Sequence, residues 1–278
     1  MTLRVGLIGD PVEHSLSPAF QQAAFDALGI DALYALWPTS AVDLPARVTS
    51  LREPDVLGAN VTLPHKQAAF ALVDDVTERA AAAHAVNTIV SRDGRLHGDN
   101  TDIPGFLAPL DERGLRLHSL HAVVLGAGGA AHAVVVALLL AGCGGITVAN
   151  RHPARAEALA AELGAPPSLR TAALDATLAG ALQSAGLLVN ATAAGWQGDA
   201  LPLDSALLRA LPPTALVYDL IYRETPLLRA AVGLGLGTLD GLRMLVHQGA
   251  ESFRCWTDQA PPLEVMWQAA LSARDRRA

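Results

Sequence analysis

The sequence predicts an α/β fold built as two domains. Short apolar runs typical of buried strands alternate with helical patterns along nearly the whole chain, as in a sheet covered by helices on its faces. A length of 278 residues suits two domains, each with its own core. Near the middle, a glycine-rich turn over residues 126–130 joins an apolar strand to a helix, which indicates a second α/β unit beginning near residue 104.

In the first unit, each strand is bounded by a turn signal. Ser17 is a favourable helix N-cap, Pro18 suits the first helical position, and Asp93-Gly94 predicts a two-residue hairpin turn. Strands are expected over 3–8, 34–37, 57–62, 86–91 and 95–97, and helices over 19–28, 42–51, 67–73, 76–85 and 106–113. The polar run 98–102 is expected to be a loop before the last of these helices.

The second unit repeats the alternation, and two of its strands end in polar residues, Asn190 and Asp219. Strands are expected over 122–125, 146–149, 187–189 and 216–218, and helices from the glycine turn to 140, from 153 onward, and over 227–235, 240–256 and 264–273. Open α/β sheets bind ligands at the carboxyl ends of their strands, so these polar residues are candidate ligand contacts. The last helix is expected to fold back on the first unit.

The composition excludes several classes of protein. Apolar residues make up 51% and charged residues 17%, which is typical of a globular chain. A net charge of −7 argues against a nucleic-acid partner, and the basic cluster Arg274, Arg276 and Arg277 is interpreted as a solvated tail. The two cysteines, Cys143 and Cys255, lie in apolar helical patterns and form no disulfide framework, and no metal-ligand cluster is evident.

No membrane span or export signal is predicted. Residues 122–149 contain no Asp, Glu, Lys or Arg and are long enough to cross a bilayer, but glycines divide them into strand, turn, helix, turn and strand. Asp10 and Glu13 interrupt any apolar N-terminal region, so no signal peptide is predicted. We therefore expect a cytoplasmic protein.

Lys66 is the only lysine, beside 19 arginines. A guanidinium stays protonated, whereas a lysine amine gives up and regains a proton more readily, so Lys66 is a candidate for proton transfer. The alternative is chance in an arginine-rich composition. Asparagines also stand where a side-chain amide can meet a ligand, at the ends of apolar runs or beside turns: Asn60, Asn87, Asn100, Asn150 and Asn190.

The glycine turn fits a dinucleotide site. Gly126 permits the tight turn, Gly128 lets the backbone approach a pyrophosphate, and small Ala131 allows close packing of the following helix. The next strand ends in Asn150-Arg151 and Arg155 follows, with no carboxylate to accept from a ribose 2′-hydroxyl, which favours a 2′-phosphate and hence NADP(H). The alternatives are a turn without a ligand and a helix start with solvated arginines.

Four more polar residues are candidates with plain alternatives. Ser15 has no capping role, so the two hydroxyls that flank Leu16 predict polar ligand contacts at Ser15 and Ser17, and the alternative for Ser17 is capping alone. The alternative for Asp102 is a helix N-cap, and the alternative for Gln248 is an ordinary exposed position.

On its motifs the chain resembles the shikimate dehydrogenase family. The motifs run almost from end to end: Ser15-Leu-Ser-Pro18, Asn60-Val-Thr-Leu-Pro-His-Lys66, Ala85-Val-Asn-Thr88, Asn100-Thr-Asp102, Gly126-Ala-Gly-Gly-Ala130, Asn150-Arg151, Asn190-Ala-Thr192, Tyr222 and Gly241-Leu-Arg-Met-Leu-Val-His-Gln248. The resemblance implies a substrate domain of residues 1–103 plus 240–278, an NADP-binding Rossmann domain of residues 104–239, and a cleft between them.

The resemblance also implies the reaction and the residues. It implies reversible NADPH-dependent reduction of 3-dehydroshikimate to shikimate, on the pathway to chorismate and the aromatic amino acids, by a monomer or homodimer. Lys66 and Asp102 would be the catalytic acid–base pair, without a metal. The implied substrate contacts are Ser15, Ser17, Asn60, Thr62, Lys66, Asn87, Asp102, Tyr222 and Gln248. The implied cofactor contacts are Glu78, Gly126, Ala127, Gly128, Gly129, Ala130, Asn150, Arg151, Arg155, Thr192, Leu220 and Gly241.

The chain departs from the family's commoner pattern at three places. Gln21-Gln22 stands where His-Asn is frequent, His132 replaces a frequent arginine beside the glycine turn, and His152 stands where a hydroxyl residue is common. Three alternatives stay open: a quinate/shikimate dehydrogenase using NAD, a non-catalytic NADPH-binding regulator, and a biosynthetic relative acting on an aminated ring. Ser15 and Ser17 favour shikimate, because some quinate-using relatives carry threonine at one of these positions.

Overall fold

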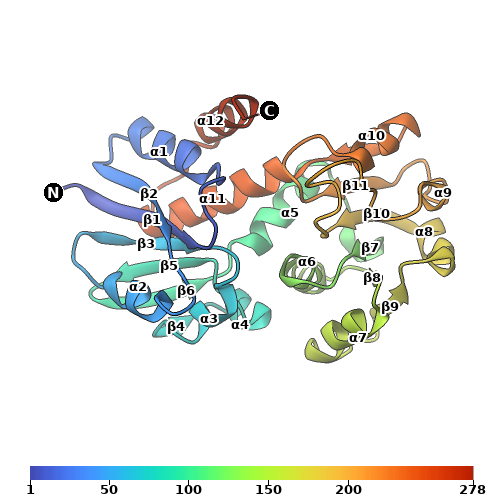
Figure 1. Ribbon diagram of the computed structural model, residues 1–278, viewed down its shortest axis with the longest axis horizontal. Helices are drawn as coiled ribbons and strands as arrows, with labels where there is room; N and C mark the ends of the chain where they lie inside the picture. The colour runs from blue at the N-terminus through green and yellow to red at the C-terminus, as the bar shows by residue number, and fades with distance from the viewer. Residues whose placement is uncertain (278) are drawn as a thin grey trace. The chain divides into compact units, whose positions relative to one another are not determined.

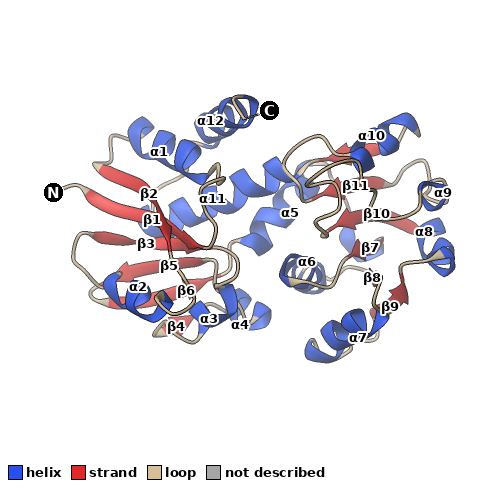
Figure 2. Cartoon of the chain, in the orientation of Figure 1, coloured by secondary structure: helices blue, strands red, loops and turns tan. Residues whose placement is uncertain are grey.

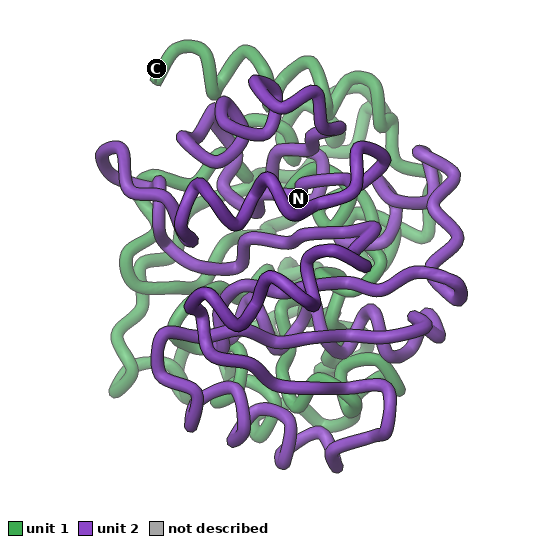
Figure 3. Tube along the Cα trace, turned by 90° about the vertical axis from the view of Figure 1, so that its right-hand side faces the viewer, with its two compact units in different colours: residues 1–105, 245–278 green, residues 106–244 purple. Residues whose placement is uncertain are grey.

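The computed structural model describes residues 1–277, which form two compact units (Figure 3). Unit 1 comprises Met1–Gly105 and the chain from Leu245 onward, and unit 2 comprises Phe106–Met244. The chain passes between the units within two helices, α5 (Asp102–Glu112) and α11 (Gly241–Thr257). Each unit has its own sheet with helices around it, which confirms the predicted α/β class (Figure 2). The assignment of residues 1–103 plus 240–278 to substrate and 104–239 to cofactor stays a prediction.

The sheet of unit 1 is mixed. Its strand order is β2-β1-β3-β5-β6-β4, with bounds β1 (Leu3–Gly9), β2 (Ala32–Pro38), β3 (Val56–Val61), β4 (Asp75–Val76), β5 (Thr88–Arg92) and β6 (Arg95–Asp99). β5 runs antiparallel to both β3 and β6, and the other pairs are parallel. The β5–β6 turn has Asp93 at φ 51° and Gly94 at φ 74°, both left-handed, which confirms the predicted two-residue hairpin.

Helices cover both faces of this sheet (Figure 1). One face packs α2 (Leu44–Ser50), α3 (Lys66–Phe70) and α4 (Glu78–Ala83) onto strand residues such as Ile8 and Ile89. The other face carries α1 (Ser17–Ala27), α11 and α12 (Leu263–Asp275), where Phe25 of α1 packs against Phe253 of α11 with ring centroids 5.0 Å apart. The last helix therefore belongs to unit 1, as predicted.

The sheet of unit 2 is parallel throughout. Its order is β12-β11-β10-β7-β8-β9, with bounds β7 (His121–Leu125), β8 (Gly145–Asn150), β9 (Leu169–Ala173), β10 (Ala185–Asn190), β11 (Leu216–Asp219) and β12 (Gly237–Leu239). The chain builds outward from β7 on one side and then from β10 on the other. The strand order therefore reverses between β7 and β10, which is the point where doubly wound sheets bind ligands.

The core of unit 2 follows from the two-residue period of its strands. Val217 of β11 lies in a core with the helices α8 (Ala179–Gln183), α9 (Ser205–Leu208) and α10 (Pro226–Gly233). The next residue, Tyr218, points away from that core and stacks on Phe106 of α5 at 5.3 Å. The remaining helices are α6 (Gly129–Leu140), α7 (Pro153–Glu162) and two short 3-10 turns, η1 (Leu117–Ser119) and η2 (Ala176–Leu178).

The structure corrects several expectations. The loop predicted up to residue 102 ends earlier, because α5 begins at Asp102. The helix predicted over 76–85 is a two-residue strand followed by α4, whose N-cap Thr77 accepts from the Ala80 N–H. β9, β12, α8 and α9 were not predicted. Cys143 follows α6 in a turn and is not helical, and no helix within residues 1–277 is both long and apolar enough to cross a bilayer.

Candidate active site

Lys66 and Asp102 form a direct ion pair in unit 1. Each is the first residue of its helix, α3 and α5 respectively, and Lys66 Nζ donates to Asp102 Oδ2 at 2.6 Å. Their side chains are 28% and 10% exposed, so the carboxylate is nearly buried while the amine stays accessible. The structure thus brings together the two residues predicted as an acid–base pair.

Two amides complete this cluster. Asn87 Nδ2 donates to Asp102 Oδ1 at 2.9 Å and lies 3.4 Å from Gln248 Oε1, while Gln248 Nε2 donates to the carbonyl of Leu245 at 2.8 Å. Gln248 is only 9% exposed, so the alternative of an ordinary exposed residue is wrong. The carboxylate of Asp102 is therefore held from two sides, by the amine of Lys66 and the amide of Asn87.

Asn60 supports the cluster from behind. Its Oδ1 accepts from Tyr34 Oη at 2.9 Å, and its Nδ2 donates to the carbonyl of Asn87 at 3.2 Å and to Ser252 Oγ at 2.9 Å. Its amide is thus already bonded within the protein. A direct contact of Asn60 with substrate stays a prediction.

The serine loop before α1 is tied to the C-terminus. Ser15 Oγ accepts from the Ser17 N–H at 3.1 Å, and Ser17 is buried as the first residue of α1, whose N-cap is Leu16. Ser17 is therefore not the N-cap that we predicted. Arg277 donates to the carbonyls of His14 and Ser15 at 2.7 and 3.2 Å, so it anchors this loop and is not part of a solvated tail.

The glycine turn of unit 2 lies at the carboxyl end of β7, beside the reversal of strand order. Gly126 has φ 113°, and a Cβ there would lie 2.9 Å from the carbonyl oxygen of Ala191, so only glycine fits. Gly128 has φ −102°, and a Cβ there would meet no protein atom within 4 Å. Neither the backbone nor a neighbour requires glycine at 128, so the open space suits the close approach of a phosphate to the N-terminus of α6.

The residues after β8 fit a phosphate in part. Arg151 and Arg155 are both exposed, and Asn150 Oδ1 accepts from the His152 N–H at 2.9 Å, which shapes the turn. His132 is buried, with its Nε2 3.6 Å from Glu162 Oε1, and therefore does not present a cation to solvent as an exposed arginine would.

The ends of β10 and β11 share a buried polar network. Thr192 Oγ1 donates to Asn190 Oδ1 at 2.7 Å, and Asn190 Nδ2 donates to Asp219 Oδ1 at 3.0 Å. Burial raises the pKa of Asp219, and this effect outweighs the hydrogen bonds that it receives. Gly241 packs so closely against the carbonyl of Leu220 that a side chain there would overlap it, so these two predicted cofactor residues are neighbours.

Two predicted residues stand apart from these clusters. Tyr222 packs edge-on against Trp196, with ring centroids 5.1 Å apart, in unit 2. Glu78 is exposed at the start of α4, in unit 1. Thr62 is half-buried directly after β3, Ala127 lies in the glycine turn, and Ala130 lies in the first turn of α6. Within residues 1–277, no group of three or more His, Cys, Asp or Glu side chains could hold a metal ion.

Sequence reasoning missed the residues that support Asn87. Thr88, Thr101 and Ser252 surround its amide oxygen or link to its neighbours, and Ser252 Oγ lies within 3.0 Å of four polar atoms. A signal was present, because Ser252 lies four residues after Gln248 and therefore on the same face of α11.

The fold and these clusters define a class of protein. A doubly wound parallel sheet with a glycine turn at its switch point is a dinucleotide-binding unit. Unit 1 adds a partly buried amine–carboxylate pair with converging amides. Together they define a two-unit α/β protein of the dehydrogenase type.

Comparisons with known proteins identify the family. Family models described as the shikimate dehydrogenase substrate binding domain, shikimate/quinate 5-dehydrogenase and the shikimate 5′-dehydrogenase C-terminal domain match residues 7–89, 110–196 and 241–271. A shikimate dehydrogenase (NADP(+)) from Symbiobacterium thermophilum is 46% identical over 97% of this chain and 94% of its own length.

Solved structures agree. Shikimate 5-dehydrogenase from Thermus thermophilus, in complex with NADP(H) and shikimate, has a TM-score of 0.87 and 42% identity, and covers 98% of this chain and 100% of that chain. Quinate dehydrogenase from Corynebacterium glutamicum, in complex with NAD, has a TM-score of 0.88 and 32% identity, with coverage of 98% and 99%. The chain belongs to the shikimate dehydrogenase family, which confirms the predicted resemblance.

Proposed function

We propose that the chain catalyses the reversible NADPH-dependent reduction of 3-dehydroshikimate to shikimate, a step towards chorismate and the aromatic amino acids. Membership of the family makes it an NADP-dependent oxidoreductase acting on a CH–OH group. The observation that carries the proposal is the ion pair of Lys66 with Asp102 at 2.6 Å, in a chain whose relatives include a structure with NADP(H) and shikimate.

The chemistry needs a proton donor at the substrate oxygen. NADPH supplies the hydride, and as the ketone is reduced, negative charge develops on that oxygen. Lys66 donates a proton there when its amine lies within about 2.6–3.2 Å of the oxygen. In the reverse direction, the same amine accepts the proton of the hydroxyl group. Asp102 keeps the amine oriented throughout.

The amides and hydroxyls fix the ring. An ammonium has three donor positions, and Asp102 takes one of those of Lys66. The remaining positions are available to the substrate, together with the second amide proton of Asn87. We assign further substrate contacts to Ser15, Ser17, Asn60, Thr62, Tyr222 and Gln248.

The cofactor residues follow the glycine turn and the neighbouring strand ends. The Gly126 N–H donates to the carbonyl of Ala149 at 2.9 Å, so the backbone N–H groups of residues 127–130 would hold the pyrophosphate at the N-terminus of α6. Arg151 and Arg155 would pair with the 2′-phosphate, as guanidinium groups do with phosphate oxygens. Further contacts are assigned to Glu78, Asn150, Thr192, Leu220 and Gly241.

We place the enzyme in the cytoplasm as a monomer or homodimer without nucleic-acid or membrane partners. The two cysteines are unpaired, which suits a reducing compartment, and the net charge of −7 disfavours a polyanionic partner. Light scattering of the purified chain gives the oligomeric state.

The test is an absorbance assay at the nicotinamide band with shikimate and NADP. The wild-type chain should reduce NADP, and Lys66→Met should lower kcat by about 10²–10⁴-fold while NADPH binding persists. Lys66→Arg is the matched control for charge, because it keeps the cation but holds its proton, and it should also be slow. Near-normal turnover of Lys66→Met would contradict the proposed role.

A second candidate is quinate oxidation with NAD. It is favoured by the likeness to the quinate dehydrogenase from Corynebacterium glutamicum. The same assay with both acids and both cofactors separates the two, because a preference for quinate and NAD would reverse the assignment. A chain that binds NADPH tightly without turnover would instead be a regulator.

A further inference from the structure

The amide of Asn87 has a defined orientation. Its Oδ1 lies 2.7 Å from the backbone N of Thr101, which can only donate, so an oxygen must face it. The nitrogen of the amide therefore faces Asp102 Oδ1 at 2.9 Å. Rotating the amide by 180° would place two donors against each other at Thr101 and two acceptors against each other at Asp102.

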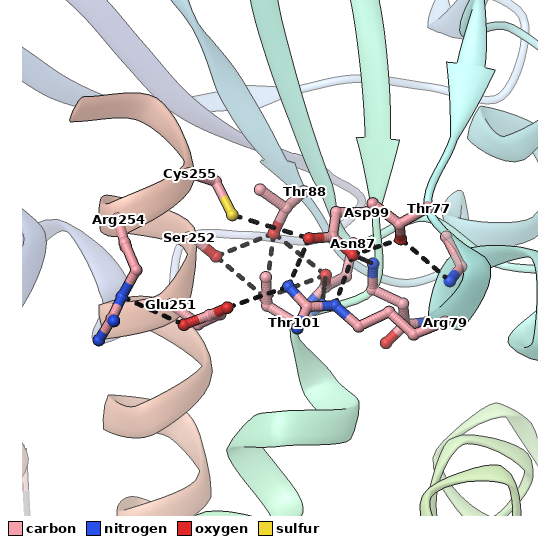
Figure 4. A network of polar contacts seen from close by, with 12 residues as sticks. Thr77, Arg79, Asn87, Thr88, Asp99, Thr101, Glu251, Ser252, Arg254 and Cys255 are labelled. Atoms are coloured by element: carbon pink, nitrogen blue, oxygen red, sulfur yellow. Dashed lines mark hydrogen bonds and ion pairs between the residues drawn. The ribbon is translucent and has the colours of Figure 1, made fainter. Parts of the chain in front are cut away.

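Three buried hydroxyls hold this orientation (Figure 4). Thr88 Oγ1 and Thr101 Oγ1 each lie 3.1 Å from Asn87 Oδ1, and they lie 3.0 Å from each other. Each hydroxyl has one proton, so one of the two donates to Asn87 Oδ1 while the other donates within the trio. Ser252 Oγ completes the trio, at 2.8 Å from Thr88 Oγ1 and 3.0 Å from Thr101 Oγ1. Thr88, Thr101 and Ser252 are fully buried, so the loss of one of these bonds is costly, because water cannot readily replace it.

Ser252 links this trio to α11. Its hydroxyl donates to the carbonyl of Gln248 at 2.9 Å, one turn earlier, and it accepts from Asn60 Nδ2 at 2.9 Å. Its neighbour Glu251 is tied to the sheet by Arg79, which bonds Glu251 Oε1 at 3.1 Å (Figure 4). These bonds fix the position of Ser252 relative to the sheet. Its hydroxyl thus joins Gln248 and Asn60, two residues proposed to bind substrate.

We propose that Ser252 is a positioning residue that acts through Asn87. The proton of Ser252 goes to the carbonyl of Gln248, so Ser252 Oγ accepts from one of the two threonine hydroxyls and fixes it. The other threonine hydroxyl and the Thr101 N–H hold the amide oxygen of Asn87, and the amide holds Asp102 in the orientation that directs the amine of Lys66. The hydrogen-bond partners of Ser252 are Asn60, Thr88, Thr101 and Gln248, and neither Lys66 nor Asp102 is among them. This inference rests on the proposed function, because it assigns Ser252 a role in the same reaction.

The test is a double-mutant cycle. Ser252→Ala should lower kcat by about 10-fold, within the roughly 10²-fold loss that a 1 Å misplacement can cause, and leave the Kd for NADPH unchanged. In the Asn87→Ala background, the same change should alter kcat and the shikimate Kd by less than about twofold, because residues that act as one unit are not additive. The Kd is measurable by calorimetry even when turnover is not.

The control removes a similar hydroxyl from the same helix. Thr257 Oγ1 donates to the carbonyl of Phe253 at 2.8 Å, the same one-turn bond that Ser252 makes, without a link to Asn87. Thr257→Ala should therefore keep wild-type kcat. Thr88→Val, which removes a hydroxyl without changing volume, should reproduce the effect of Ser252→Ala if that variant loses its fold.

Each outcome decides between the two proposals. The positioning role would be overturned if Ser252→Ala and Thr88→Val both kept the kcat of the wild-type chain, or if Ser252→Ala lost equal activity with Asn87 present and in the Asn87→Ala background. Turnover of shikimate by the wild-type chain would leave the proposed function intact in either case. A wild-type chain without shikimate turnover would overturn the proposed function instead. In that case the Kd cycle still reports whether Ser252 acts through Asn87.

Discussion

The carboxylate of Asp99, at the end of β6, accepts four N–H and O–H hydrogen bonds from side chains and backbone. Its Oδ1 accepts from Arg79 Nε at 2.7 Å, Thr77 Oγ1 at 2.6 Å and the Asn100 N–H at 2.7 Å, and its Oδ2 accepts from Arg79 Nη2 at 2.5 Å (Figure 4). The side chain of Asp99 is 8% exposed and that of Arg79 is 28% exposed. We predict that Asp99→Asn destabilises the protein strongly, although it is almost isosteric.

The magnitude follows from the lost bonds. An asparagine keeps an oxygen for Thr77 and the Asn100 N–H, but its NH₂ faces the guanidinium and both charge-assisted bonds to Arg79 are weakened or lost. Breaking a buried ion pair costs about 3–5 kcal/mol. Arg79 is partly exposed and keeps Glu251 at 3.1 Å, so we reduce the expected loss to about 2–3 kcal/mol in the free energy of unfolding.

The pH dependence gives an independent check. Burial works to raise the pKa of Asp99, but hydrogen bonds from Arg79 and Thr77 outweigh it and hold that pKa below its ordinary value. A carboxyl group with a lowered folded-state pKa stabilises the fold above its unfolded pKa of about 3.9, and this stabilisation is lost as pH falls through the folded value. The difference between wild type and Asp99→Asn should therefore be full at pH 7 and shrink below about pH 4.

The assay is urea unfolding followed by circular dichroism, at pH 7 and at several values down to pH 3. Asp258→Asn is the matched control, because it removes an Arg–Asp pair at 2.8 Å whose side chains are 50% and 75% exposed. Exposed pairs contribute little, so the control should stay close to wild type. The reasoning is refuted if the two variants lose equal stability, or if the gap for Asp99→Asn stays constant at acid pH.

Two further predictions concern the cofactor and the contact of α5 with α11. Arg151→Ala should raise the Kd for NADPH far more than that for NADH, with Arg170→Ala as an exposed control, and equal losses would show that Arg151 does not bind the 2′-phosphate. Gly105→Ala should cost about 1–3 kcal/mol and lower kcat, because a Cβ would lie 2.5 Å from Gln248 Cβ and 2.7 Å from its backbone N. Gly180→Ala, whose Cβ would meet nothing within 4 Å, should leave thermal unfolding and kcat unchanged or slightly raise stability.

Local chemistry made part of the fold predictable. The turn at Asp93-Gly94 needs two left-handed residues, and the sequence offers a pair that tolerates them. The strand β12 at the sheet edge has only three residues and no alternating pattern. It was not predicted because its pairing with β11, and not its local sequence, makes it a strand. The start of α5 was missed because polar residues and Pro104 indicate a loop, yet proline is tolerated in the first turn of a helix.

The candidate site was predictable only where its residues lie in motifs. Lys66 stands out as the only lysine and Asp102 ends the polar run 98–102, so both were candidates from the sequence. The link from Thr88 to Ser252 joins residues 164 positions apart in the chain, and serine and threonine in a strand or helix carry no periodic signal. Such a link follows from the packing of α11 on the sheet, which no local pattern encodes.

The protein's own hydrogen bonds fix the cluster in unit 1. Asp102 already accepts from Lys66 and Asn87, and the amide of Asn87 is fixed by Thr101. The second amide proton of Asn87 has only a long contact of 3.4 Å to Gln248, so a substrate hydroxyl can take it without breaking a strong bond. Donors that are fixed in advance need no reorganisation when charge develops on the substrate oxygen, and this is why positioned side chains accelerate the reaction. The bond with Asp102 therefore favours one orientation of the Lys66 amine, as the proposed acid–base role requires.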